Sequence, residues 1–469
     1  MKLWKASLLA LLCAGTACQT VTDRMVPDAD EASPESVGTF RYGGTGDADA
    51  APEEWWTVFA DATLADLINR LNDANPDVAA ALARVDQSFA ILGITRSSMF
   101  PNVRGNATVG RQRDSQNNLL FPINQLEYDR FRVGLSATWE VDLWGRVRAT
   151  VKRDRLRAEG EAVSYRNVLL SLQASLAEQY FAYRAAQTEV SLLRQAEALA
   201  EDALSVQQSR LELGQGVQAD VAKAKLDLQT TAAATEAARR NAGKLLHSIA
   251  TLTGTMPSKL DELNGHSGTT APEIPTGVPS ELLIRRPDLM AADRSLRAAA
   301  QQIGINQADF LPKLTLVGSG ALASLRAENL FEADSGLFDV GPQLDVPIFS
   351  YQLRKNAVAQ AKAMYREAAA NFRSAFLTAV REVDDALLEL RSFGREAHLQ
   401  TAALSAATEA ATAAKDRYER GLDSYLEYIA AEQVRLQSAA RERNTHAQGR
   451  IASVRLIRAL GGSWGPIEE

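Results

Sequence analysis

Cysteine, histidine and aromatic residues are scarce in this sequence. Its 469 residues contain two cysteines, Cys13 and Cys18, and four histidines, and aromatic side chains make up 6% of the total. The histidines are scattered along the chain and lack the spacing of metal ligands. We therefore expect no metal site, and at most one thiol in the exported chain, which excludes an intramolecular disulfide.

Motifs of common enzyme and nucleotide-binding sites are also missing. The sequence contains no Gly-Lys-Ser/Thr phosphate loop, no His-Glu-x-x-His, no Cys-x-x-Cys and no Gly-x-Ser-x-Gly. The formal net charge of −7 argues against a nucleic-acid coat, because phosphate binding needs clustered Lys and Arg. The sequence therefore predicts no catalytic residue, no cofactor and no nucleic-acid partner, and an enzyme is the least supported class.

Long apolar runs are absent too. The mean hydropathy is −0.18, which does not fit a polytopic helical membrane protein. Near the N-terminus, Lys2 and Lys5 precede the apolar run Leu8–Ala14, which is too short to cross a bilayer and is typical of a secretory signal. We expect a signal peptide over residues 1–17.

Cys18 follows Gly15-Thr16-Ala17, and this stretch resembles a bacterial lipobox, although Gly15 stands where Leu is usual. We expect Cys18 to be acylated and to become the first residue of the mature chain. The alternative is cleavage by the ordinary signal peptidase. Residues 18–54 are rich in Asp, Glu, Ser, Gly and Pro without a hydrophobic period, so they are predicted to form a solvated, flexible tether.

An internal duplication follows the tether. Pro76-Asp77 recurs as Pro287-Asp288, and Pro101 as Pro312, at an offset of 211 residues; Gly214 recurs as Gly421 at an offset of 207. Two copies of one structural unit explain these offsets. We assign residues 55–265 to repeat 1 and residues 266–469 to repeat 2.

Each repeat changes from helical periodicity to strict alternation and back. The alternating stretches cover residues ~102–112 and ~129–143 in repeat 1, and ~313–323 and ~337–348 in repeat 2, and each predicts a strand with one apolar and one polar face. Pro342 and Pro347 suggest an irregular end to the last strand. Strands of about ten residues are long enough to cross an outer membrane when tilted.

The helical parts are rich in alanine and contain no proline from Ile123 to Met256 or from Ile348 to Gly465. The stretch from Gly145 to Leu213 would span about 100 Å as one helix. A reversal at Gly214 then leads into a shorter return helix. Repeat 2 follows the same scheme, with a tip at Gly421. The return helices are expected to stack end to end on the helices that begin at Pro76 and Pro287.

These elements predict a mainly α fold with membrane β structure. A membrane barrel must close, and four strands per chain are too few, so several chains would have to contribute to one barrel. A wide helical tube packed through Ala, Ser and Gln would continue it.

At this point the sequence resembles the TolC/OprM family of outer-membrane efflux ducts. The matching stretches are Trp55-Trp56-x-x-Phe59, Trp139-Glu-Val-Asp-Leu-Trp-Gly-Arg146, Arg286-Pro-Asp288, Phe310-Leu-Pro312, Tyr418-Glu-Arg-Gly421 and Leu460-Gly461-Gly462-Ser463-Trp464. The resemblance implies a homotrimer with a 12-stranded β-barrel in outer-membrane lipid and a periplasmic barrel of long antiparallel coiled-coil helices. It also implies a periplasmic adaptor protein and an inner-membrane pump, often of the proton-driven RND class, for drugs or other small molecules.

The candidate functional residues lie at the two helical tips, where the resemblance places adaptor docking and the periplasmic aperture. The residues expected at the tips are Arg210, Gly214, Asp220, Arg417 and Gly421. Those expected at the aperture are Tyr418, Asp423, Leu426 and Glu427, with Leu426 forming an apolar ring and Glu427 a charged ring in a trimer. Relatives often carry an acidic residue one turn further on, where this chain has Ala430. The structural alternative is that Gly214 and Gly421 are turn residues only and that Glu427 lies on a solvated flank.

Two other functions remain open at this point. One is the outer-membrane duct of a type I protein secretion system. The other is a structural coiled-coil protein of the envelope, which would explain the helices but not four alternating strands at duplicated positions.

Overall fold

The computed structural model describes residues 25–27, 40, 54–115, 127–263 and 285–462. The predicted signal peptide, Cys18, most of the tether and the Ser463-Trp464 end of the last motif lie outside these residues. The chain divides into two compact units. Unit 1 consists of Met1–Pro34, Arg84–Ala162 and Ala291–Arg373, and unit 2 of Glu35–Ala83, Val163–Met290 and Ser374–Glu469. Each unit thus contains segments of both sequence repeats.

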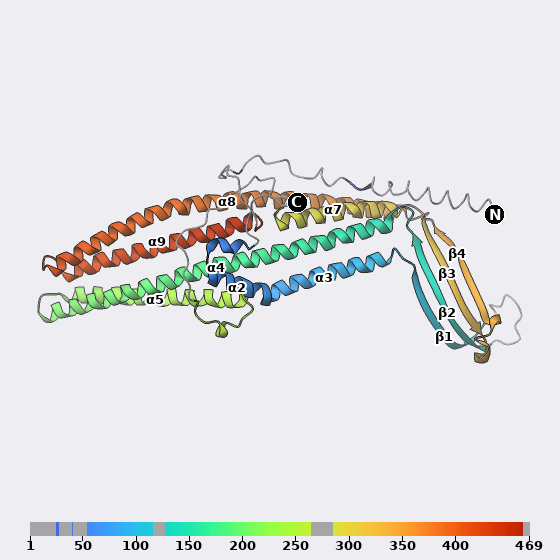
Figure 1. Ribbon diagram of the computed structural model, residues 1–469, viewed down its shortest axis with the longest axis horizontal. Coiled ribbons are helices and arrows are strands. Elements are labelled where there is room, and N and C mark those ends of the chain that lie inside the picture. The colour runs from blue at the N-terminus through green and yellow to red at the C-terminus, as the bar shows by residue number, and fades with distance from the viewer. Residues whose placement is uncertain (1–24, 28–39, 41–53, 116–126, 264–284, 463–469) are drawn as a thin grey trace. The chain divides into compact units, whose positions relative to one another are not determined.

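Unit 1 contains one antiparallel four-stranded sheet in the order β1-β2-β3-β4 (Figure 1). The strands are β1 (Asn102–Arg113), β2 (Glu127–Val141), β3 (Lys313–Ser324) and β4 (Gly336–Asp345). The alternating sequence pattern located all four strands to within three residues at each end. The strands of the two repeats are joined through the β2–β3 pair, in which Phe131 lies opposite Ser324.

The end of β4 corrects the sequence-based prediction. The strand ends at Asp345 rather than near residue 348, because Pro347 cannot donate a ladder hydrogen bond. Pro342, by contrast, lies inside β4, opposite Leu316 of β3. A proline is tolerated there because β4 is the last strand of the sheet in this chain, so one side of its backbone has no partner strand among the described residues.

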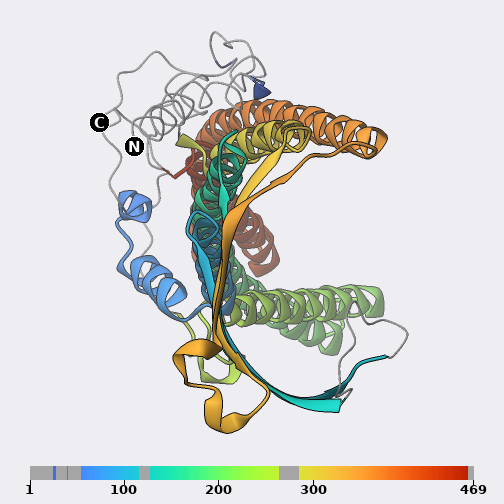
Figure 2. The ribbon, with the colours of Figure 1, turned by 90° about the vertical axis from the view of Figure 1, so that its right-hand side faces the viewer.

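The strand register separates an apolar face from a polar face. One row across the four strands reads Val103, Ala137, Gly318 and Val340, and the adjacent row reads Arg104, Ser136, Ser319 and Asp339. Large side chains of the apolar face are uncovered, including Val109 and Phe338, which is 85% exposed. A sheet of this kind needs an apolar medium on one side and water on the other. Figure 2 shows that the sheet is curved.

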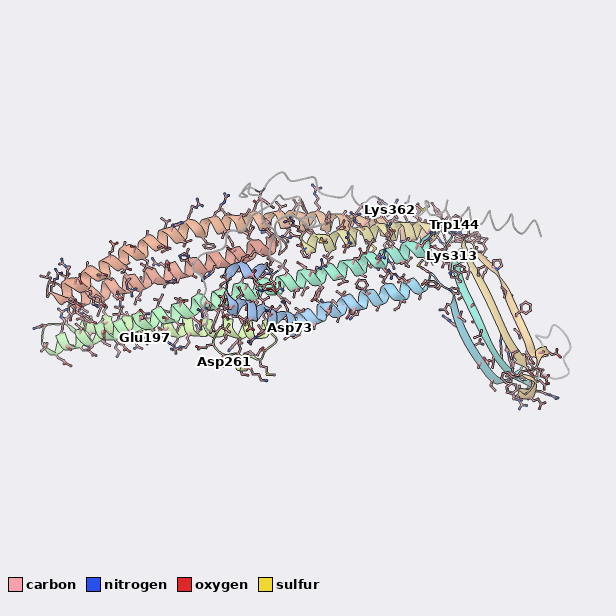
Figure 3. All side chains as sticks on the ribbon, viewed as in Figure 1. Asp73, Trp144, Glu197, Asp261, Lys313 and Lys362 are labelled. Carbon is pink, nitrogen blue, oxygen red and sulfur yellow. The ribbon has the colours of Figure 1, made fainter. Side chains whose placement is uncertain are left out.

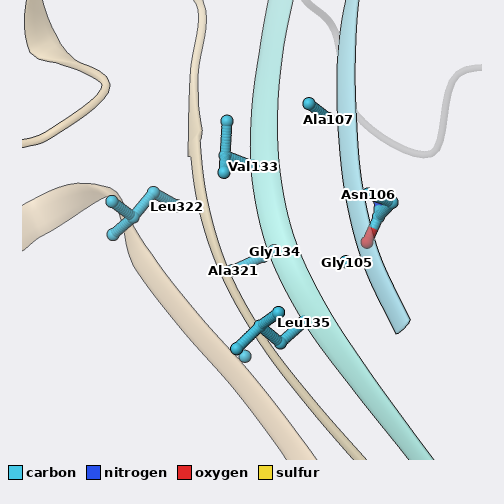
Figure 4. A pocket seen from close by; sticks show the side chains of 9 residues that line it. Gly105, Asn106, Ala107, Val133, Gly134, Leu135, Ala321 and Leu322 are labelled. Carbon is cyan, nitrogen blue, oxygen red and sulfur yellow. The ribbon is translucent and has the colours of Figure 1, made fainter. Parts of the chain in front are cut away.

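Small residues leave a hollow of about 630 Å³ across β1, β2 and β3 (Figure 4). The apolar side chains of Val133, Leu135 and Leu322 line it. On the opposite side of β2, Gly134 faces Ala321 so closely that an added Cβ would lie 2.6 Å from the Ala321 Cβ. Glycine therefore allows β2 and β3 to approach at the join between the repeats.

The motif from Trp139 to Arg146 forms the corner between β2 and the following helix. The Asp142 carboxylate accepts hydrogen bonds from the backbone N–H groups of Val147 and Arg148 at 2.9 and 3.0 Å, which caps the helix N-terminus. Arg146 binds Glu140 through two hydrogen bonds of 3.0 and 2.6 Å. Trp144, labelled in Figure 3, donates its indole N–H to the Pro312 carbonyl at 2.7 Å. The motif is therefore structural.

The long helix predicted from Gly145 to Leu213 matches α4 to within one residue at each end, and the helices predicted to begin at Pro76 and Pro287 begin there. The six main helices are α3 (Pro76–Ser97), α4 (Arg146–Glu212), α5 (Gln218–Leu252), α7 (Pro287–Ala308), α8 (Tyr351–Glu419) and α9 (Tyr425–Ala459). Short elements are η2 (Trp55–Phe59), α2 (Ala62–Ala74), η4 (Pro257–Lys259), η6 (Ala327–Asn329) and η7 (Ala333–Ser335). Among the described residues, α3 alone has the length and apolar composition of a membrane-crossing helix, which is weak evidence by itself.

The main core lies in unit 2. Trp55, Phe59, Tyr180 and Phe181 are buried there, and the Tyr180 hydroxyl donates to the Asp61 carboxylate at 2.8 Å. Asp61 also caps α2 by accepting from two backbone N–H groups. Phe40 belongs to the same core, with 6% of its surface exposed. The predicted tether is thus not solvated throughout, because one aromatic residue inside it is buried.

Two equivalent junctions join helices end to end in unit 2. At the first, Asn75 donates from its side-chain amide to the Leu252 carbonyl at 2.8 Å, at the start of α3 and the end of α5. At the second, Arg286 donates to the Ala459 carbonyl at 3.0 Å, at the start of α7 and the end of α9. The contacts agree with the end-to-end stacking predicted from the duplication.

Candidate functional site at the helical turns

The two long hairpins turn through the same backbone geometry. Gly214 and Gly421 have φ values of +70° and +72°, in the left-handed region that favours glycine. The backbone N–H of Gln215 donates to the Arg210 carbonyl at 2.8 Å, and that of Leu422 donates to the Arg417 carbonyl at 2.9 Å. Both turns thus close with the hydrogen-bond pattern of a glycine-capped helix end. Figure 1 shows the two turns at the same end of the helices.

The first turn, between α4 and α5, has exposed charged residues on both sides and an N-cap residue without a side-chain hydrogen bond. Arg210 and Asp220 are both exposed, in the last turn of α4 and the first turn of α5 respectively. Val217 occupies the N-cap position of α5 and makes no side-chain capping hydrogen bond. Open space surrounds Gly214, so only its backbone conformation requires glycine.

The second turn, between α8 and α9, is held by side chains. Arg417 binds Asp423 across the turn through two hydrogen bonds, of 2.5 Å from Nε and 3.1 Å from Nη2. Ser424 caps α9 by accepting from the backbone N–H of Glu427. The structure therefore brings together Arg417 and Asp423, which the sequence placed in the separate groups for docking and for the aperture.

The Arg417–Asp423 pair has a defined pH dependence. The hydrogen bonds from Arg417 hold the pKa of Asp423 below its ordinary value of 3.8. A carboxylate with a lowered pKa stabilises the folded turn above its unfolded pKa and loses that contribution as pH falls through the folded pKa. We expect single-channel conductance to show no step from Asp423 between about pH 7 and about pH 5, and a step only below its ordinary pKa. The variant Asp423→Asn should lack that acid step; an Asp423-dependent step near neutral pH would contradict the pairing.

An aromatic cluster lies beside this pair. The ring centroids of Tyr418 and Tyr425 are 5.0 Å apart, and those of Tyr425 and Tyr428 are 5.8 Å apart. The Tyr425 hydroxyl donates to the Asp202 carboxylate of α4 at 3.1 Å. Burial first, and the bond to Asp202 second, raise the pKa of Tyr425 above 10.0, so the hydroxyl keeps its proton and acts as donor at neutral pH. This hydrogen bond connects the first helical hairpin to the second.

The remaining aperture residues lie on the first turns of α9. Leu426 is half-buried and Glu427 is exposed, and the next turn carries the exposed Ala430. Glu432, one of the nearest carboxylates, binds Arg435 through hydrogen bonds of 2.9 and 2.6 Å. Glu427 is therefore the better candidate for an uncompensated negative charge near the turn.

Asp202, Tyr425 and Tyr428 were missed from the sequence. Comparison of the repeats at the 207-residue offset contains the signal for the two tyrosines, because Gln218 and Val221 stand at their equivalent positions in the first turn. The contrast indicates that the second turn carries chemistry absent from the first. No comparable sequence signal marks Asp202, whose partner is 223 residues away. Within the described ranges, no group of His, Cys, Asp or Glu side chains is placed to hold a metal ion.

The family comparison reproduces the duplication. A protein-family model described as outer membrane efflux protein matches residues 67–255 and 278–462. The two matches start 211 residues apart and end 207 residues apart, the same offsets that the repeated motifs have. The chain belongs to the outer membrane efflux protein family.

Relatives and solved structures cover nearly all of this efflux protein. The solvent efflux pump outer membrane protein SrpC of Pseudomonas putida is 27% identical over 99% of both chains. The outer membrane protein OprJ of Pseudomonas aeruginosa is 29% identical over 88% of this chain and 86% of its own length. The CmeC outer membrane channel of Campylobacter jejuni superposes with a TM-score of 0.87 at 24% identity, over 93% of this chain and 94% of that one. The outer-membrane channel OprN superposes at 0.82 with 25% identity, over 93% and 98%.

Proposed function

We propose that this efflux protein is the outer-membrane duct of a tripartite efflux system and works as a trimer. The observation that carries the proposal is the sheet with one apolar and one polar face, in a chain that also forms two long helical hairpins. The sheet fits a bilayer outside and water inside, and the hairpins fit an aqueous periplasmic tube. The duct conducts passively and uses no catalytic group.

The sheet of one chain cannot close into a barrel, which supports an assembly of more than one copy. Four strands are too few for a spanning barrel, and β1 and β4 expose edges that hydrocarbon does not tolerate. Because the strands alternate in direction, β4 of one copy would lie antiparallel to β1 of the next. Three copies would then form a continuous barrel of twelve strands.

Helix α3 supports the same assembly. Its apolar side chains Phe89, Ile91 and Ile94 are exposed in the single chain, and Ile94 is 71% exposed. A helix beside a membrane barrel would bury such apolar side chains against an adjacent copy rather than leave them in water. N-terminal acylation at Cys18 would add a lipid anchor to the assembled trimer.

The two hairpin turns support our assignment of the partners, and the names of the relatives support our assignment of the substrate class. We assign adaptor docking to the turns at Gly214 and Gly421, and the closing aperture to Tyr418, Asp423, Leu426 and Glu427 of the second turn. The relatives named for solvent and toluene efflux favour small organic molecules, delivered through a periplasmic adaptor by an inner-membrane pump of the RND class. No such support exists for protein secretion.

A deletion strain tests this function. Loss of the gene should lower the tolerated concentration of antibiotics, dyes and organic solvents, and the tagged protein should co-purify with an adaptor from outer-membrane fractions. The protein should migrate as a heat-modifiable trimer. A monomer released from membranes without detergent, or a deletion strain defective only in secretion of a polypeptide, would overturn the proposal.

Glu427 offers a separate test of the aperture. Three carboxylates at a narrow pore attract cations and repel one another. We expect Glu427→Ala to raise single-channel conductance in planar bilayers and to reduce cation selectivity. Glu419→Ala, which removes an exposed carboxylate at the end of α8, is the control. Identical conductance and selectivity in native protein and Glu427→Ala would remove Glu427 from the aperture.

A further inference from the structure

Two arginines lie on the polar face of β2, an inner strand between β1 and β3 (Figure 1). Arg130 and Arg132 are separated from Ser136 of the polar row by six and four residues, and even separations in a strand place side chains on the same face. The Cα atoms of the two arginines are about 7 Å apart, because a strand rises about 3.4 Å per residue. We call Arg130 and Arg132 the basic pair.

The neighbours of the basic pair on this face are small. Thr108 of β1 and Ala323 of β3 lie opposite Arg132, and Gly110 of β1 lies opposite Arg130. None of these residues has a side chain long enough to cover a guanidinium group. Arg130 is exposed and Arg132 is half-buried. The polar face is therefore open to a ligand at this position.

The basic pair has no ion-pair partner among the residues that the structure describes. Arg130 donates to Oε1 of Gln112 at 3.5 Å, which is a neutral acceptor. The Nε atom of Arg132 is shielded from solvent and has no hydrogen-bond partner in the described part of the chain. The sequences of β1 and β3 contain no Asp or Glu, and neither does that of residues 115–126, which connect β1 to β2. Two adjacent like charges repel each other, so an anion that contacts both would stabilise them.

The carboxylates closest in sequence have other partners or lie on the other face. Asp114 accepts a hydrogen bond from the Tyr128 hydroxyl at 2.9 Å. Glu127 and Asp129 lie on the opposite face of β2, where Glu127 pairs with Arg111 at 3.7 Å. These three carboxylates therefore do not neutralise the basic pair.

The polar face of β4 is too distant to neutralise the pair. Asp339 lies two strands across and four residues along the sheet from Arg132, which separates their Cα atoms by about 16 Å. The Debye length at physiological ionic strength is about 8 Å, so salt largely screens an exposed charge at this separation. The basic pair therefore keeps its positive charge for a ligand from solution.

We infer that the basic pair is a binding site for polyanionic small molecules, which carry two or more phosphate or sulfonate groups. Guanidinium groups bind the oxygens of such groups through paired N–H donors, and rings of arginine attract anions in pores. The inference rests on the proposed function, because closure of the sheet places its polar face toward water inside a barrel. Three copies then contribute six guanidinium groups to one lumen, and this part of the duct attracts anions.

Isothermal titration calorimetry of the full-length protein with inositol hexakisphosphate tests the site. In a detergent without phosphate groups, Arg130→Gln/Arg132→Gln should bind at least about tenfold more weakly than the native protein, because it loses charge-assisted hydrogen bonds. The control Arg111→Gln/Arg113→Gln removes the same charge from the same hairpin on the opposite face, and should bind like the native protein. Equal affinity of the native protein and the basic-pair variant, or weaker binding in the control alone, would overturn the inference.

Ion selectivity gives a second readout. In planar phosphatidylcholine bilayers with a KCl gradient, Arg130→Gln/Arg132→Gln should shift the reversal potential toward a greater preference for K⁺ over Cl⁻, and concentrated salt should abolish the difference. The control variant should keep the native reversal potential. An unchanged reversal potential in the basic-pair variant contradicts the inference, whereas a native protein that forms no channel contradicts the proposed function instead.

A charge-conserving variant keeps the test independent of folding defects. Arg130→Lys/Arg132→Lys retains both positive charges but loses the paired N–H donors of guanidinium. It should keep the native reversal potential and bind inositol hexakisphosphate more weakly than the native protein. All variants should migrate as the same heat-modifiable trimer as the native protein. A lysine variant with the reversal potential of the glutamine variant would show that charge at these positions does not act on the permeating ions.

Discussion

Replacing Tyr425 with phenylalanine should raise the single-channel conductance of the reconstituted channel. The substitution deletes the hydrogen bond to Asp202 that connects the second hairpin to α4, and it keeps the ring that stacks between Tyr418 and Tyr428. Such a bond contributes about 0.5–1.5 kcal/mol to the state that contains it. Its loss should favour an opened tip by about two- to tenfold for each copy.

The neighbouring tyrosine provides the control. Tyr428→Phe removes a hydroxyl three residues away for which no hydrogen bond is found among the described residues, so its conductance should match that of the native protein. The double variant Asp202→Asn/Tyr425→Phe should conduct like Tyr425→Phe, because the two groups act through one bond. If Tyr425→Phe and Tyr428→Phe conduct equally, the bond between the hairpins does not hold the aperture.

Substitution of Gly254 by alanine should strongly destabilise the folded chain. Gly254 has a φ of +67°, and an added Cβ would lie 2.3 Å from the Ala74 carbonyl oxygen at the junction between α5 and α3. The left-handed conformation costs an alanine about 1–2 kcal/mol. The backbone clash adds about 1–3 kcal/mol as overpacking. Gly461, its counterpart in repeat 2, should respond in the same way, because its added Cβ would lie 2.9 Å from the Arg285 carbonyl oxygen.

Gly214 separates the two contributions. Its φ of +70° is nearly the same, but nothing lies within 4 Å of an added Cβ. Gly214→Ala should therefore lose only the conformational part, about 1–2 kcal/mol. Thermal unfolding followed by circular dichroism should give the highest melting temperature for the native protein, a lower one for Gly214→Ala and the lowest for Gly254→Ala. Equal melting temperatures for the two alanine variants would show that the junction relaxes around the added methyl group.

Much of the fold follows from local sequence patterns. The period of two in residues such as Val133 and Leu135 located the strands, and the long stretches without proline located the helices, because both signals depend on near neighbours along the chain. The duplication predicted the two tips and the stacked helices. The error in the last strand was local as well: β4 ends at Asp345 rather than near residue 348, because Pro347 cannot donate a ladder hydrogen bond.

The candidate site was predicted less completely. The sequence identified the glycines at the turns. It also identified Arg417 and Asp423 as candidates, because these two residues are only six positions apart and flank the same turn. Tyr425 was not selected, because its significance comes from a contact with Asp202 on another hairpin. Phe40 was assigned to the tether, because a single aromatic residue in a polar segment carries no periodic signal.

By itself, the sequence determined the element types, their order, the duplication and the family resemblance, since these depend on residue patterns and on spacing along the chain. Tertiary structure alone decided which distant groups meet. It pairs β2 of repeat 1 with β3 of repeat 2 and forms the hydrogen bond from Tyr425 to Asp202. It also packs backbone against Gly254 and Gly461 so closely that a side chain does not fit there. Local propensity is independent of such contacts, and the free energy of burial and pairing depends on them.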